Sequence, residues 1–140
     1  MKNLEGVSPI SILLLRISLT GIFINAAITH LVFTEKTTAR LLESPIIDFL
    51  QVFASAETHV ILSGVLLFVF GFTFLLGIYT RWSAFALMGL LIPITISMQL
   101  SAGILHGPLW KNVAIAGGLL FFMLNDLSSY TLVPRKNSKL

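Results

Sequence analysis

Long apolar runs dominate the pattern of hydrophobic and polar positions along the chain. Four runs contain almost no charge: residues 10–33 (interrupted by Arg16 and His30), 60–79, 82–105 and 107–125 (interrupted by Lys111). Their lengths are close to the roughly 20 apolar residues that a helix needs to cross a bilayer. Strands of a membrane barrel are about ten residues long and alternate strictly, which these runs do not. The pattern predicts an all-α integral membrane four-helix bundle, with spans at about residues 10–33, 58–79, 82–103 and 108–127.

A different periodicity lies between the first two spans. Ser44 and Pro45 are suited to be the N-cap and first residue of a short helix. The apolar positions that follow have helical spacing, and polar residues fall on the opposite side: Ile46, Phe49, Leu50 and Phe53 against Asp48, Gln51 and Ser55. We expect an interfacial helix over about residues 45–55.

The connections and small residues indicate how the spans pack. Only two residues separate Tyr79 from Trp82, so the second and third spans must be antiparallel neighbours. Helices in membranes associate through small residues that let their backbones approach. Such residues share one face on spans two, three and four: Gly64 and Gly71; Ser83, Ala86 and Gly89; Ala114 and Gly118. We expect residues 1–140 to form a single transmembrane domain.

Composition agrees with this assignment and excludes several functions. Hydrophobic residues make up 56% of the 140 residues and charged residues 11%, with a mean hydropathy of +0.93. This is the balance of a membrane protein, whose main partner is the lipid bilayer. The absence of cysteine excludes disulfides, thiolate metal sites and dithiol redox relays. The nine basic residues are scattered along the chain and form no stripe, so a nucleic-acid partner is not expected.

The basic residues also predict an orientation. Counted on alternate sides of the four spans, six lie on the side of the termini and three on the other: Lys2, Arg16, Arg81, Arg135, Lys136 and Lys139 against Lys36, Arg40 and Lys111. Because cytoplasmic loops carry the excess of lysine and arginine, both termini are predicted to be cytoplasmic. The interfacial helix then lies on the outer side.

Polar residues fall in two layers, of which the outer layer holds all three histidines. Its members are Asn25, Thr29, His30, Glu57, His59, Ser63, Gln99, His106 and Lys111. His30, Glu57, His59, Gln99 and His106 form a candidate outer-side polar site, able to hold a metal ion or to accept protons beside a quinone. Alternatively, each is simply a polar residue at a helix end, with Glu57 complementing the helix dipole. On a helix His59 points about 200° away from Glu57, so these two can hardly share a pocket.

The inner layer is a candidate charge cluster of Arg16, Arg81, Asn125 and Asp126. Arg16 lies about 10 Å inside its apolar run, where an unpaired arginine costs at least about 2.5 kcal/mol. Asp126 stands at the C-terminal end of the last span, where the dipole disfavours an anion. We therefore expect Arg16, with Arg81 as competitor, to pair with Asp126 or Asn125. This cluster is either a structural clamp or a site for an anionic head group or substrate.

Three stretches resemble the DoxX-like family of four-helix membrane proteins. They are LLLRISLTGIF (Arg16, Gly21, Phe23), LLGIYTRWSAFAL (Gly77, Thr80, Arg81) and KNVAIAGGLLFFM (Asn112, Gly117, Gly118). The chain departs from the family where Leu67 replaces a frequent glutamate in span two, where Ala26 and Ala27 replace a frequent glycine, and where His30 replaces a frequent lysine. These departures weaken the transfer of a buried acidic function.

The resemblance implies a bacterial cytoplasmic (inner) membrane location, and relatives that stand beside thiosulfate:quinone oxidoreductase and other redox-associated systems. It favours an accessory or anchoring subunit of a redox- or metal-related complex, with other membrane or periplasmic subunits as partners, over autonomous catalysis. One alternative is a quinone-reactive subunit that uses His30 and Glu57. Another is an oligomeric carrier of small solutes or lipids that uses the inner cluster. Quinone or bound lipid are the ligands to consider, and a homo-oligomer is expected if the chain forms a pathway.

Overall fold

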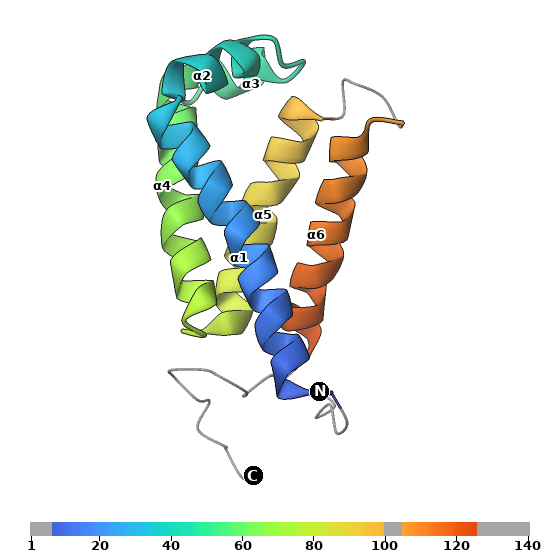
Figure 1. Ribbon diagram of the computed structural model, residues 1–140. Coiled ribbons are helices and arrows are strands. Elements are labelled where there is room, and N and C mark those ends of the chain that lie inside the picture. Colours follow the sequence, from blue (N-terminus) through green and yellow to red (C-terminus); the bar gives the residue numbers. More distant parts are fainter. Residues whose placement is uncertain (1–6, 100–104, 126–140) are drawn as a thin grey trace.

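The computed structural model describes residues 7–99 and 105–125 and is all-helical over them (Figure 1). Its helices are α1 (Pro9–Val32), α2 (Thr34–Leu42), α3 (Ile47–Gln51), α4 (Ala56–Leu75), α5 (Thr80–Met98) and α6 (Gly107–Leu124). Four of them, α1, α4, α5 and α6, are long and apolar enough to cross a membrane. The predicted helical membrane bundle is therefore confirmed, and a bilayer is its environment.

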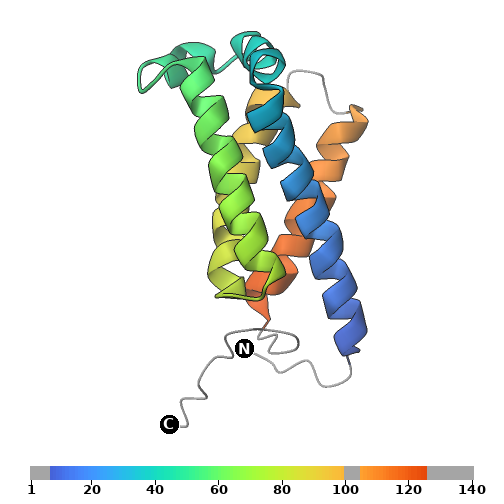
Figure 2. The ribbon, with the colours of Figure 1, turned by 60° about the vertical axis from the view of Figure 1, so that its left-hand side comes forward.

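The bundle has two different ends. At one end the residues between α4 and α5 make a tight turn, which we call the hairpin end; at the other, α2 and α3 fold over the helices, which we call the cap end (Figure 1). Helix α1 begins and α6 ends at the hairpin end (Figure 2). Which end faces the cytoplasm stays a prediction from the basic residues.

The hairpin turn stops α4 earlier than the sequence predicts. We expected the second span to reach residue 79, but α4 ends at Leu75. Gly77 (φ 71°) and Tyr79 (φ 45°) have left-handed backbone conformations, which glycine adopts without strain and which a helix cannot continue. The Ser83 hydroxyl donates to the carbonyl of Ile78 and lies 3.1 Å from the Thr73 hydroxyl, so side chains hold the turn closed.

The cap is helical as expected, but it contains two helices where one was predicted. The charged stretch after α1 forms α2, in which Thr37 and Leu41, four residues apart, are buried. The second helix, α3, begins at Ile47 instead of Pro45, so Ser44 is not its N-cap. Ser44 is buried, and its backbone N–H donates to the Leu41 carbonyl, closing the turn between the two helices.

The bundle is built from two close pairs of helices, α1 with α4 and α5 with α6, and α4 also packs on α5 (Figures 1 and 2). Glycines make the α1–α4 pair close. A Cβ at Gly64 would lie 2.9 Å from Leu31 and 3.0 Å from His30, and one at Gly71 would lie 3.3 Å from Ile24. Gly118 of α6 approaches Leu19 of α1 in the same way.

One small-residue face differs from the prediction. A Cβ at Gly89 of α5 would have no neighbour within 4 Å, so this glycine is not in a helix contact. The core instead contains bulky side chains from all four spans: Ile12, Leu19 and Phe23 with Leu67, Phe74, Leu87, Leu91, Ile115, Leu119 and Phe122. Phe74 of α4 and Phe122 of α6 contact each other edge to face near the hairpin end, with ring centroids 4.9 Å apart.

Candidate functional site

His30 lies where α1 packs most closely on α4. Its side chain is only 9% exposed, and Nδ1 lies 2.8 Å from the hydroxyl oxygen of Ser63. The Ser63 hydroxyl donates its one hydrogen to the Val60 carbonyl, so it accepts the bond from His30. The adjacent Gly64 permits this approach because a side chain there would strike His30. His30 therefore joins α1 to α4 by a hydrogen bond.

His59 and Glu57, two residues apart on α4, have different surroundings. His59 Nε2 donates to the backbone carbonyl of Leu50, 2.8 Å away, and so ties α4 to α3. Glu57 is exposed in the first turn of α4, where its charge complements the helix dipole. Their separate directions agree with the angular estimate from the sequence.

His106 and Gln99 face each other at the cap end of α5 and α6. His106 is the N-cap residue of α6, and its Nε2 donates to the side-chain oxygen of Gln99, 2.9 Å away. Gln99 is the C-cap residue of α5, directly after Met98. Two of the five predicted outer-side residues are thus brought together, in a contact between the third and fourth spans.

A further polar contact joins α5 to α6 and was not predicted. Asn112 is buried, and its side-chain amide donates to the Thr95 hydroxyl, 2.9 Å away, which in turn donates to the Leu91 carbonyl. Asn112 was singled out only through the family resemblance, and Thr95 was overlooked. A threonine and an asparagine inside two apolar runs that must be neighbours are the signal that could have found them.

The five predicted outer-side residues do not gather around one space. His30, His59 and His106 each bond a different partner, on three different pairs of elements, and Glu57 is exposed. Within residues 7–99 and 105–125, no three histidine, aspartate or glutamate side chains are placed to share a metal ion. The arrangement fastens helices together at the cap end.

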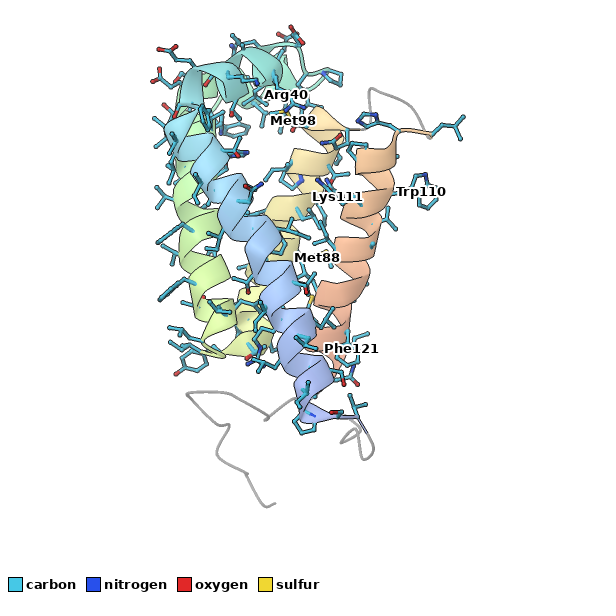
Figure 3. The ribbon with its side chains drawn as sticks, viewed as in Figure 1. Arg40, Met88, Met98, Trp110, Lys111 and Phe121 are labelled. Atoms are coloured by element: carbon cyan, nitrogen blue, oxygen red, sulfur yellow. The ribbon has the colours of Figure 1, made fainter. Side chains whose placement is uncertain are left out.

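The cap end also exposes basic and aromatic side chains (Figure 3). Arg40 of α2 lies beside the end of α5 near Met98, and Trp110 points away from the bundle while its neighbour Lys111 leaves α6 on another side. On α3 and the residue pair that follows it, Phe49, Val52 and Phe53 are 66%, 78% and 70% exposed. We call these three residues the cap patch. Its rings of Phe49 and Phe53 contact each other edge to face.

At the hairpin end, the three described residues of the predicted inner cluster have different environments. Arg16 is fully buried, and its guanidinium carbon lies 5.5 Å from the centre of the Phe122 ring of α6, within reach of a cation–π contact. Arg81 is exposed at the start of α5. Asn125 donates to the Phe121 carbonyl of its own helix, and Asp126 lies outside the described residues. The proposed pairing of Arg16 with Asp126 stays a prediction.

Comparison with known proteins gives one match. The model of the family described as DoxX matches residues 11–100, which run from the first turn of α1 to the end of α5. No curated protein and no solved structure matches the chain.

Proposed function

Because the chain belongs to the DoxX family, we propose that it is an accessory membrane subunit that anchors a redox- or metal-related partner. The observation that carries the proposal is the way its polar side chains are used at the cap end. His30, His59 and His106 each hold two elements of the bundle together. Side chains that hold helices together stabilise the bundle, and a stable bundle provides a fixed surface for assembly with other subunits.

The cap patch is the surface on which we place the partner. Phe49 and Phe53 are large aromatic side chains, which supply much of the binding energy in protein interfaces when they become buried. They project from α3, which is tied to α4 through Leu50 and His59. The patch is therefore held by the membrane-spanning bundle and is presented beyond its cap end.

Gentle solubilisation followed by mass spectrometry and absorbance spectroscopy tests this proposal. The wild-type chain should co-purify with a protein that carries a redox cofactor or metal. The double variant Phe49→Ser/Phe53→Ser should lose that protein while keeping its own helix content and melting temperature. Leu105→Ser is the matched control, because Leu105 is 95% exposed at the same end but outside the patch. Recovery of the chain without any such protein would contradict the proposal.

The second candidate, a quinone-reactive subunit, is favoured by the burial of His30 within a membrane-spanning helix. An ionisable side chain at such a depth is a functional-site candidate by default. The purified chain should then retain a quinone, and His30→Gln, which keeps a hydrogen-bond donor for Ser63, should release it. If His30→Gln instead preserves both stability and partner binding with no quinone present in wild type, the accessory role is favoured.

A further inference from the structure

The outward face of α1 carries a polar side chain that the bundle does not explain. Asn25 is exposed, and its carboxamide makes no hydrogen bond to any residue in the described part of the chain. It lies seven residues before Val32, the end of α1, which is about 10 Å along the helix. At this depth lipid offers the amide neither donors nor acceptors, so an amide facing lipid is costly.

Asn25 belongs to an exposed stripe that runs along α1. Steps of three and four residues, the spacing of a coiled-coil seam, connect its members, all of which are exposed: Ser11, Leu14, Ser18, Gly21, Asn25, Ile28 and Val32. We call them the α1 stripe. A Cβ at Gly21 would have no neighbour within 4 Å, so another backbone has room to approach there. In Figure 1 no other helix lies in front of α1.

The outward face of α4 shows what a lipid-facing surface of this protein looks like. Beyond its first turn, where Glu57 and Thr58 are exposed, its exposed side chains are large and apolar: Ile61, Leu62, Val65, Phe68, Val69 and Phe72. Lipid tails solvate such apolar side chains well, whereas they offer a carboxamide no hydrogen bonds. The contrast indicates that protein, and not lipid, covers the part of the α1 stripe around Asn25.

We propose that the occupant is a second copy of this chain, which packs its own α1 stripe against the first. Two copies inserted in the same direction are related by a two-fold axis along the membrane normal, so their α1 helices are parallel and each stripe position meets itself. A carboxamide both donates and accepts, so Asn25 of one copy can bond Asn25 of the other. A single asparagine at such a position also fixes the register of a parallel helix pair.

This inference is independent of the proposed accessory role, because it concerns the purified chain alone. The natural sequence contains no cysteine, so one introduced cysteine reports one position. In lipid vesicles under a mild oxidant, Ile28→Cys should form a disulfide-linked dimer. Val65→Cys is the matched control: Val65 of α4 is 44% exposed and Ile28 is 47% exposed. It should stay monomeric at the same ratio of protein to lipid.

The hydrogen bond is tested by adding Asn25→Leu to the Ile28→Cys chain. The protein-to-lipid ratio needed for half-maximal cross-linking should rise about tenfold, as expected for the loss of a hydrogen bond between membrane helices. Asn25→Gln, which keeps donor and acceptor, should restore most of the cross-linking. Equal cross-linking at Ile28→Cys and Val65→Cys would overturn the proposal, as would a ratio that Asn25→Leu leaves unchanged. In native membranes, Ile28→Cys that links only to a different protein would assign the stripe to that protein.

Discussion

Helix α1 has polar side chains on two opposite faces, and the two faces differ in how these groups are satisfied. On the inward face, His30 bonds Ser63 of α4 and Arg16 lies over the Phe122 ring of α6. On the outward face, the Ser18 hydroxyl bonds within its own helix and Asn25 makes no bond to a described residue. A polar side chain that contacts a neighbouring helix contributes to the packing of the bundle. One that the bundle leaves facing outward indicates a contact with another molecule.

This comparison predicts that substitutions on the inward face reduce stability, whereas substitutions on the outward face change association. The largest loss is expected for Arg16→Ala, because it removes a large, fully buried side chain and its contact with Phe122. By analogy with truncations of large core side chains, unfolding should become easier by about 3 kcal/mol. Thermal unfolding in detergent measures it.

Two further arginine variants sharpen this result. Arg16→Met fills most of the same volume without the charge, so a smaller loss than for Arg16→Ala would assign the effect to packing. Arg81→Ala is the exposed control and should change stability by less than about 0.5 kcal/mol. Equal losses of stability for Arg16→Ala and Arg81→Ala would contradict the difference in burial between the two arginines.

The next largest effect is expected at the α1–α4 contact. Gly64→Ala places a methyl group against the Cβ of His30 and the side chain of Leu31, and overpacking of this kind costs about 2 kcal/mol. Gly89→Ala is the matched control in a span, because its new methyl group has no neighbour within 4 Å. It should be neutral or gain up to about 1 kcal/mol from helix propensity. A loss at Gly89 comparable to that at Gly64 would contradict the packing.

A smaller loss is expected for Asn112→Leu, which has a similar volume but cannot donate to Thr95. Hydrogen bonds between membrane helices contribute about 1 kcal/mol to stability. Asn112→Leu and Thr95→Val should therefore each lower the free energy of unfolding by about this amount. Asn125→Leu removes only a bond within α6 and should cost less. If Asn125→Leu proved the more harmful of the two asparagine variants, the contact between α5 and α6 would not be a fastener.

The smallest effect on the stability of one copy is expected for Asn25→Leu, because this side chain touches no partner in the described bundle. Its melting temperature in dilute detergent should equal that of the wild type or exceed it slightly. A large loss of stability at high dilution would mean that Asn25 belongs to the inward set, and the comparison between the two faces of α1 would fail.

Much of the fold was predictable because membrane spans follow from local composition. The four apolar runs became α1, α4, α5 and α6, since about 20 apolar residues in sequence suffice to define a span. The end of α4 was mispredicted, and the helix α2 was not predicted. Left-handed conformations at Gly77 and Tyr79 stop α4, and α2 is held by tertiary burial of Thr37 and Leu41, which its charged sequence obscures.

The candidate site was less predictable, because its contacts join residues far apart in the sequence. His30 lies near the cap end, but its partner Ser63 is 33 positions away, and their contact depends on how α1 is rotated against α4. Glu57, which the quinone-reactive alternative uses together with His30, is exposed. Sequence position was enough to sort the polar residues into two layers. Which residues pair within a layer depends on how each helix is rotated about its axis, and the sequence does not show this.

The central claim is that polar side chains at membrane depth fasten helices to one another, and a double-mutant cycle at His30 and Ser63 tests it most directly. His30→Leu, Ser63→Ala and the double variant would be compared with the wild type by reversible unfolding in detergent. The bond predicts a coupling of about 0.6 to 1.7 kcal/mol between the two positions. Strictly additive losses, with zero coupling, would contradict the account.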